Sequence, residues 1–259
     1  MKRLPRRLQH GEEATLVEHL GELRTRLLIS LLALAPAFLV AFAFQERLVR
    51  WLSKPLPDDK TLVTLGVVEP FTTAVKISLA VAVAVTLPIL LYQLWAFLAP
   101  AIEEHVQRTV AIFATLSTIL FAGGVAFSYF VVMPRALYFL TNFNDEVFQV
   151  QIRASYYFSF VTLTLLATGL AFQMPIFILA LVRLRVLTAA KLRRNRRLGM
   201  LGMLVFAILL PTVDPVSLAL EVVPLLILFE LSIWLSTYME KRWDIADETS
   251  RWSIEEPET

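Results

Sequence analysis

Long uncharged stretches of this chain are separated by short charged ones. A helix needs about 20 residues to cross about 30 Å of hydrocarbon. Four uncharged runs have 18 to 29 residues: Leu27–Phe44, Ile77–Ile102, Thr109–Pro134 and Ala154–Val182. The pattern predicts transmembrane helices over approximately 27–46, 76–99, 108–134 and 154–182.

Two further runs are shorter and suggest a helical hairpin. Leu198–Val213 has only 16 residues, and Val216–Met239 is interrupted by Glu221 and Glu230. The sequence PTVDP between them is typical of a turn. We therefore predict spans over approximately 197–212 and 216–236. The fold class is an all-α polytopic membrane protein with six transmembrane helices, the last two short, within residues 16–240.

Prolines occur inside four of the predicted spans, at Pro36, Pro88, Pro175 and Pro224. Each removes a backbone hydrogen bond of the helix and favours a kink. Bent helices of this kind are expected to form a concave wall rather than a tight bundle.

Composition agrees with a membrane protein. The chain is 57% hydrophobic, with a mean hydropathy of +0.66, whereas soluble domains are about 45–50% apolar. It has no cysteine, which excludes disulfides, thiolate metal sites and a cysteine nucleophile. The sequence contains no H-E-x-x-H motif, no G-x-S-x-G elbow and no glycine-rich phosphate loop. These observations argue against an enzyme and imply no cofactor.

Basic residues predict the orientation. If both termini are cytoplasmic, that side carries 17 Lys and Arg residues and the opposite loops carry 6. The positive-inside rule then places a basic tail, 1–15, and an acidic tail, 241–259, expected to be disordered, in the cytoplasm. The loop RLRVLTAAKLRRNRR contributes most. A role in topology is sufficient to explain it, and a binding role is the less favoured alternative.

The N-terminal pair Arg6 and Arg7 has a similar explanation. Carboxylates, among them Glu12 and Glu22, separate this pair from the first apolar run. A cleavable signal needs its apolar region soon after the basic one. We therefore interpret the two arginines as cytoplasmic anchors and not as an export signal.

Carboxylates gather at the predicted cytoplasmic ends of the spans. In EHLGELRTRLL, Glu18, Glu22 and Arg26 recur every four residues and share one helical face. Two interpretations remain open: a plain Glu22–Arg26 pair within one helix, contributing roughly 0.2–0.5 kcal/mol, or part of a binding surface. After Pro100, Glu103 and Glu104 fall near the start of the next helix, where the helix dipole stabilises anions.

These residues resemble the TatC family, the multispanning receptor subunit of twin-arginine protein translocases. HLGELRTRLL resembles the family signature H-L-x-E-L-R-x-R. The likeness continues in order, from about Leu16 to about Tyr238, through SKPL, PFTTAVK, LPILLYQLWAFLAPAI, FSYFVVMPRALYFL, SYYFSFV, AFQMPI, LLPTVDP and LFELSIW. The resemblance implies a glove-shaped receptor in the bacterial plasma (inner) membrane. It agrees with six spans and two cytoplasmic termini.

The resemblance also implies a function. Family members bind the paired arginines of a folded cargo's signal peptide at the cytoplasmic rim. They recruit single-span, TatA/TatB-like partner subunits into a multi-copy complex, and the complex exports the folded cargo using the proton-motive force. Guanidinium groups pair well with planar carboxylates. By motif alignment Glu22 is the family's first carboxylate, Arg24 is expected to orient it, and His19 matches the motif. The expected partners are therefore peptides, partner helices and lipid, and not nucleic acid.

The second carboxylate of the family is missing here. The family pattern P-x-L-x-x-H-E-R becomes PAIEEHVQR, so that Val106 occupies the usual glutamate position. Glu103, about one helical turn earlier, is our candidate to replace it, with Glu104 as the weaker alternative. Phe97 matches a family aromatic and is expected to pack on the apolar part of the signal peptide.

Polar residues in the later spans are further candidates. Gln173 stands where the family often has a glutamate, and its amide serves either as a bond between helices of this chain or as a contact for a partner helix. Asp214 and Glu230 match acidic family positions, and Pro55 belongs to SKPL. Glu221 has no family counterpart. Its position fits an outward-facing or paired rim group as well as a functional carboxylate.

Two other functions remain open. A secondary transporter commonly has inverted repeats and a charged or polar site near the membrane midplane. No repeat is found here, and most carboxylates lie near the rims. The other alternative is a membrane scaffold without cargo recognition. A receptor and scaffold of the twin-arginine translocase is the favoured prediction.

Overall fold

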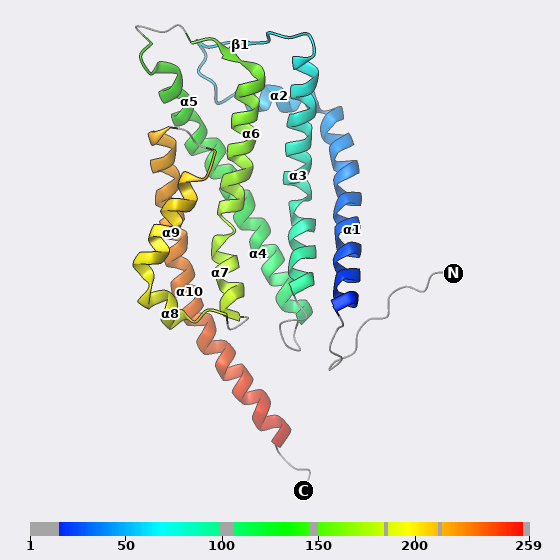
Figure 1. The fold of residues 1–259 in the computed structure, drawn as a ribbon, viewed down its shortest axis with the longest axis vertical. Coiled ribbons are helices and arrows are strands. Elements are labelled where there is room, and N and C mark those ends of the chain that lie inside the picture. The colour runs from blue at the N-terminus through cyan, green and yellow to red at the C-terminus, as the bar shows by residue number, and fades with distance from the viewer. Residues whose placement is uncertain (1–15, 99–105, 146–149, 184–185, 212–213, 256–259) are drawn as a thin grey trace, which may run out of the picture.

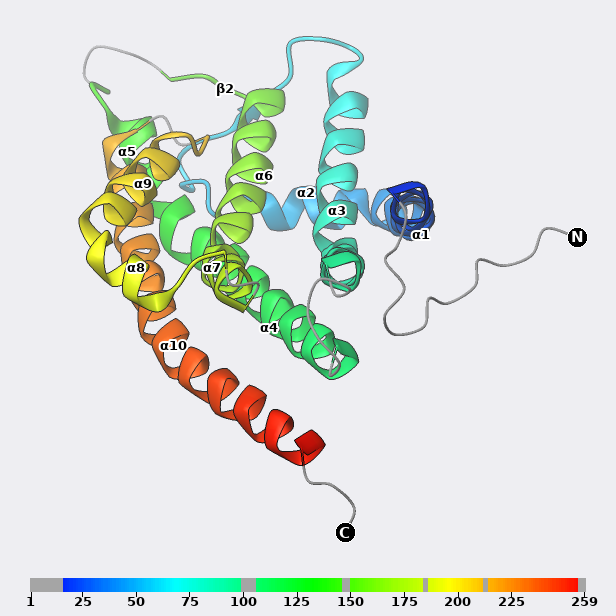
Figure 2. The same cartoon turned by 60° about the horizontal axis from the view of Figure 1, so that its bottom comes forward.

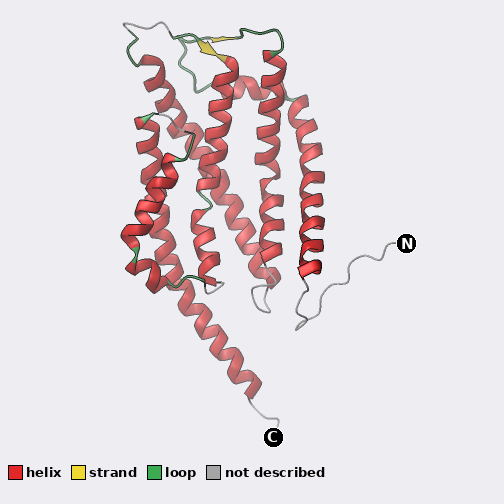
Figure 3. Cartoon of the chain, viewed as in Figure 1, coloured by secondary structure: helices red, strands yellow, loops and turns green. Residues whose placement is uncertain are grey.

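A computed structural model describes residues 16–98, 106–145, 150–183, 186–211 and 214–255. The described part is almost entirely helical, with two short strands at one end (Figures 1 and 3). The long helices stand side by side, with α1 (Leu16–Ala43) at one edge and α9 (Arg196–Ile208) at the opposite edge. This agrees with the predicted all-α class.

Five described helical segments are long and apolar enough to cross a membrane. They are Gly21–Ala43, Glu69–Phe97, Ala111–Asn142, Ala154–Arg183 and Pro215–Glu240. The predicted fifth span at 197–212 corresponds to α9, which has 13 residues. At 1.5 Å per residue α9 is about 20 Å long and does not by itself reach across about 30 Å of hydrocarbon. It packs against α10 (Pro215–Glu255) as the predicted hairpin.

The two ends of the molecule differ. The start of α1, the end of α3 (Glu69–Leu98), the start of α4 (Val106–Phe127) and α8 (Ala189–Arg194) lie at one end, which we call the α8 end (Figure 1). The opposite end, the strand end, carries α2 (Gln45–Ser53) and the strands β1 (Leu62–Val63) and β2 (Ile152–Arg153). The strands pair in parallel, with Leu62 opposite Ile152. This pairing was not predicted, because each strand is only two residues long.

Three predicted spans have different boundaries in the structure. The first helix ends at Ala43, and the amphipathic α2 begins at Gln45. The third span continues through a π-helical segment (Ser128–Val132) into α5 (Met133–Asn142). Pro134 lies in the first turn of α5, where a missing N–H is tolerated, so the helix continues past the predicted end of the span at 134.

The fourth span is divided into α6 (Ala154–Ala171) and α7 (Met174–Arg183). Phe172 and Gln173 form the break, and Pro175 is the second residue of α7. Pro175 has no N–H to donate, which explains why the helix is interrupted here. The predicted distortion at this proline is therefore present as a two-residue interruption between α6 and α7.

The C-terminal segment is helical where we predicted disorder. Helix α10 continues beyond 236 to Glu255. The sequence from 240 to 255 contains good helix formers such as Glu, Lys, Arg and Ala, and it has no glycine or proline. Local propensity is therefore enough to continue a helix that packing has already started (Figure 2).

The helices are buried to different degrees. In the fourth span, 56% of the most apolar window is buried inside the structure, and in α1 only 6%. Leu27, Leu32 and Leu39 of α1 are largely exposed. Such a surface is unfavourable in water and is compatible with hydrocarbon. The chain therefore packs around α6 and α7, while α1 leaves most of its surface for lipid.

Two close helix contacts depend on glycine. A Cβ atom on Gly169 of α6 would lie 2.6 Å from the ring of Phe121, and one on Gly124 of α4 would lie 3.0 Å from the Cα of Gly169. Small residues let the backbones of membrane helices approach closely. Gly124 and Gly169 therefore set the distance between α4 and α6.

Candidate functional site at the ends of α1 and α3

Arg26 joins α1 to α3 at the α8 end. Its Nε donates to Glu22 Oε1 at 3.0 Å, and its Nη2 makes a close contact with the same oxygen. Nη1 donates to Gln93 Oε1 at 3.1 Å. Nη2 also donates to the carbonyl oxygen of Ala96 at 3.0 Å. We call Glu22, Arg26, Gln93 and Ala96 the rim cluster.

Helix geometry explains the rim cluster. Glu22 and Arg26 lie four residues apart and therefore on one face of α1. Ala96 belongs to the last turn of α3, whose carbonyl groups have no partner within the helix and accept from a nearby guanidinium. The interpretation of Glu22–Arg26 as a plain pair within one helix is therefore incomplete, because the pair also fastens two helices.

The Glu22 carboxylate remains accessible. Its side chain is 30% exposed, and that of Arg26 is 22% exposed. Both contacts from Arg26 go to Oε1. The rim cluster thus presents a fixed and partly exposed carboxylate that already accepts from a guanidinium.

The structure places the other predicted rim residues unevenly. Arg24 is exposed on α1, and Phe97 is half-buried in the last turn of α3. Glu103 and Glu104 lie outside the described residues, and His19 lies outside the described side chains.

Ser117 of α4 connects the rim with the middle of the molecule. Its hydroxyl accepts a hydrogen bond from Trp95 Nε1 at 3.0 Å. Trp95 directly precedes Ala96 of the rim cluster. Its carbonyl oxygen accepts from Gln173 Nε2 at 2.9 Å. Gln173 therefore holds α4 to the break between α6 and α7. Its Oε1 is buried and accepts no hydrogen bond from the described residues.

Asp214, Glu221 and Glu230, at the start of α10 and within it, have three different environments. Asp214 Oδ1 accepts from the backbone N–H of Ser217 at 2.7 Å and so caps the start of the helix. Glu221 is only 1% exposed, and its Oε1 lies 3.0 Å from Thr168 Oγ1 of α6. The alternative of an outward-facing rim group at Glu221 is therefore wrong. Glu230 forms an ion pair with Arg196 of α9.

Pro55 follows α2 at the strand end and is half-buried. Two phenols hold the end of α2 in place. The hydroxyl of Tyr129 donates to the Trp51 carbonyl oxygen at 2.8 Å, and that of Tyr157 donates to the Leu52 carbonyl oxygen at 2.9 Å. The turn that contains Pro55 thus starts from a fixed position.

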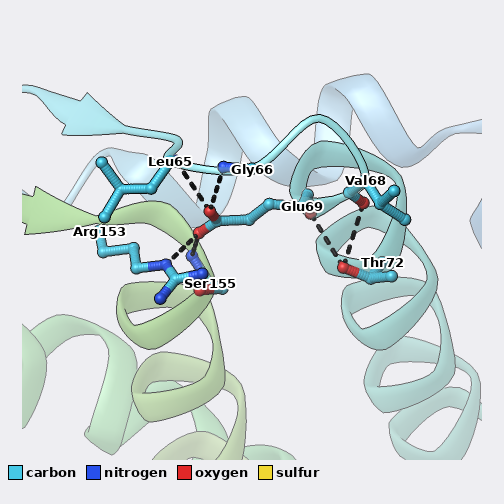
Figure 4. A network of polar contacts seen from close by, with 7 residues as sticks. All are labelled: Leu65, Gly66, Val68, Glu69, Thr72, Arg153 and Ser155. Atoms are coloured by element: carbon cyan, nitrogen blue, oxygen red, sulfur yellow. Dashed lines mark hydrogen bonds and ion pairs between the residues drawn. The ribbon is translucent and has the colours of Figure 1, made fainter.

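Glu69, which was not predicted as a site residue, organises the strand end (Figure 4). Its Oε2 accepts from the N–H groups of Leu65 (2.9 Å) and Gly66 (3.3 Å). Its Oε1 accepts from Arg153 Nε (2.9 Å) and from the N–H of Ser155 (3.2 Å). The carboxylate thus joins the loop before α3 to the segment before α6.

This network has an electrostatic consequence. The hydrogen bond to the Glu69 carboxylate raises the pKa of Arg153 above its usual value.

The acidic residue before a proline at the start of a predicted helix, in EPF, was the available sequence signal for Glu69. The distant partner Arg153 could not be recognised, because 84 residues separate it from Glu69.

Residues 18–224 match the sequence profile of the family described as Sec-independent protein translocase protein (TatC). The chain belongs to the TatC family. The TatC protein of Escherichia coli K12 is 35% identical over 227 residues, which cover 86% of this chain and 88% of that protein. TatCd of Bacillus subtilis 168 is 34% identical over 231 residues, covering 89% and 95%.

Solved TatC structures agree. The crystal structure of the twin-arginine translocase receptor TatC in DDM has a TM-score of 0.75 and 35% identity, covering 85% of this chain and 99% of that one. The resemblance drawn from the motifs is therefore confirmed. This TatC-family chain is a multi-pass protein of the inner membrane, a component of the Sec-independent protein translocase, and not an enzyme.

Proposed function

We propose that this TatC-family chain is the receptor and scaffold of a twin-arginine translocase. It binds twin-arginine signal peptides at the α8 end and recruits single-span partner subunits. The proposal rests on the likeness to a structure named as the twin-arginine translocase receptor and on the rim cluster. The proton-motive force drives export in this proposal, as the family resemblance implies.

The observation that carries the proposal is the position of Glu22. Arg26 holds its carboxylate at the end of α3, and part of the carboxylate surface stays exposed. A signal-peptide guanidinium then needs only to reach a carboxylate that is already oriented. Preorganisation lowers the entropic cost of binding. Arg26 is a positioning residue in this scheme, and Glu22 contacts the ligand.

The second arginine needs a second anion. Two guanidinium groups at a partly desolvated rim are costly unless both are paired. Glu103 supplies this carboxylate in our proposal, and Glu104 is the weaker candidate. Phe97 is in the last turn of α3, and in sequence it lies between Glu22 and Glu103. In this proposal its ring packs on the apolar part of the signal peptide. Arg24 and His19 orient the α1 side of the site.

The orientation follows from charge. The α8 end carries α8 and the basic segment 189–197, so the positive-inside rule places this end in the cytoplasm. Both chain termini are then cytoplasmic. The short α9, together with the residues that flank it, makes the fifth crossing in this proposal, and α10 makes the sixth. The bent helices form a concave, glove-like wall.

A partner helix is proposed to contact the chain near Gln173. The Oε1 atom of Gln173 is buried and accepts no hydrogen bond from the described residues, so in this proposal it becomes an acceptor for the partner when the side chains that cover it move aside, while its Nε2 remains bonded to Ser117. For Nε2, the bond to Ser117 favours the alternative role, a hydrogen bond between helices of this chain. Asp214, Glu230 and Pro55 are proposed to act by fixing the hairpin and the strand end.

Photo-crosslinking tests the receptor proposal. A photoreactive amino acid placed at Thr25, Phe97 or Ile102 should crosslink to a twin-arginine peptide and much less to a twin-lysine peptide of the same sequence. A probe at Tyr138, at the strand end, is the matched control. Equal labelling by both peptides would leave a scaffold without cargo recognition. Competition by a small solute and not by peptide would favour a transporter.

A further inference from the structure

The basic segment after α7 is a fixed helix and not a free loop. The Thr188 side chain accepts from the N–H of Lys191 at 3.2 Å and caps α8. Glu240 Oε2 of α10 accepts from the N–H of Ala189 at 3.0 Å, and Ala189 is buried. These contacts hold α8 against α10 at one height of the molecule (Figure 2).

Four cations on and beside α8 are directed to the surroundings. Lys191, Arg193, Arg194 and Arg197 are exposed and form no ion pair with another described residue. Arg196 differs, because it pairs with Glu230. A surplus of positive charge is therefore concentrated on a short, fixed surface.

An exposed aromatic pair lies at the same height. Trp234 and Tyr238 of α10 stack with centroids 6.3 Å apart and an interplanar angle of 8°. They lie between Glu230 and Glu240, the two residues that join α10 to Arg196 and to the start of α8. Trp234 is 64% exposed. Tryptophan and tyrosine with this exposure are typical of the boundary between headgroups and hydrocarbon.

The adjacent surface is apolar. Leu198 and Leu201 of α9, and Leu209 directly after it, are each more than half exposed. The molecule therefore offers cations and aromatic rings at the level of α8, and aliphatic side chains farther along α9. This arrangement matches an amphiphile with an anionic head and hydrocarbon tails. A free anion would contact only the cations on and beside α8.

We propose that Lys191, Arg193, Arg194 and Arg197, with Trp234 and Tyr238, form a binding surface for the headgroups of anionic phospholipids. The phosphate contacts the cations of α8, and the acyl chains lie along α9. This role is independent of signal-peptide binding at the rim cluster. It also goes beyond a topology determinant, which needs positive charge but neither a fixed helix nor adjacent aromatic rings.

The test is native mass spectrometry of the full chain in detergent with phosphatidylglycerol or phosphatidylcholine. The unchanged chain should bind phosphatidylglycerol preferentially. Arg193→Gln with Arg194→Gln should lower that affinity about tenfold and leave phosphatidylcholine binding unchanged, because attraction to anionic lipid grows with each basic group at the surface. Trp234→Leu should weaken binding of both lipids.

A matched control removes the same charge elsewhere. Arg47→Gln with Lys54→Gln, at the strand end, should leave phosphatidylglycerol binding unchanged. If the α8 variant does not fold, Lys191→Gln with Arg197→Gln takes its place. Unchanged phosphatidylglycerol affinity in the α8 variants, an equal loss in the control, or displacement of the lipid by an equal concentration of inorganic phosphate would each overturn the proposal.

Discussion

Arg26 donates to the carbonyl oxygen of Ala96, and through this bond the first helix is fixed to the end of the third. The same guanidinium holds Glu22, so one side chain both joins two helices and positions a carboxylate. Geometry at the rim therefore depends on a residue that need not contact the ligand.

Replacing Arg26 should show this positioning role. Arg26→Gln removes contacts to Glu22, Gln93 and Ala96, and charge-assisted hydrogen bonds contribute roughly 1.5–3 kcal/mol. We expect a lower midpoint of thermal unfolding and about tenfold weaker signal-peptide binding. Arg26→Lys should keep part of the stability but recover little affinity, because an ammonium group cannot reproduce the planar fork. Lys54→Gln, at the opposite end, is the charge-matched control. Unchanged affinity in Arg26→Gln would remove the positioning role.

The second carboxylate can be located by moving it. Glu22→Gln and Glu103→Gln should each weaken peptide binding roughly 10- to 100-fold, through loss of one charge-assisted hydrogen bond. Glu104→Gln should do less. Combining Glu103→Gln with Val106→Glu should restore affinity, because the carboxylate returns to the family's position about one turn along the chain. If Glu104→Gln is the damaging change instead, Glu104 is the replacement.

Gln173→Leu separates internal packing from partner binding. The substitution removes the bond to Ser117, so the midpoint of thermal unfolding should fall. Because the rim cluster is untouched, signal-peptide binding should remain near normal. Partner co-purification should decrease if Oε1 contacts the partner helix. Full partner recovery from the folded fraction would leave only the internal role.

Gly169→Ala should destabilise the contact between α4 and α6. Its Cβ would lie 2.6 Å from the ring of Phe121, which is itself buried. Overpacking of this kind costs about 1–3 kcal/mol. Gly123→Ala is the matched control, since nothing lies within 4 Å of its Cβ. Equal unfolding midpoints for the two variants would show that α4 and α6 can separate without cost.

Glu69→Gln should loosen the strand end. The change weakens the contact with Arg153 and the bonds from Leu65, Gly66 and Ser155, so protease cleavage between residues 54 and 66 should become faster. Glu46→Gln affects only an exposed pair with Arg50 and should have little effect. Adding Arg153→Gln to Glu69→Gln should cause little further loss. Additive losses in the double variant would mean that the two residues act independently.

From the sequence alone, the helical class, four of the long spans, the hairpin and the family could be predicted. These features depend on hydrophobic runs and local motifs, which are properties of adjacent residues. It also indicated Glu22 and Arg26, since residues four apart share a helical face. The extension of α10 to Glu255 was missed because composition suggested disorder although local propensity favoured a helix.

Tertiary structure decided every contact between distant residues. The bonds of Arg26 to Gln93 and Ala96, of Gln173 to Ser117, and of Glu69 to Arg153 link positions 56 to 84 residues apart. The burial of Glu221 against Thr168 is of the same kind. No periodicity encodes such partners, because they depend on how the helices pack. In hydrocarbon, where an unpaired polar group is costly, packing selects which polar side chains meet.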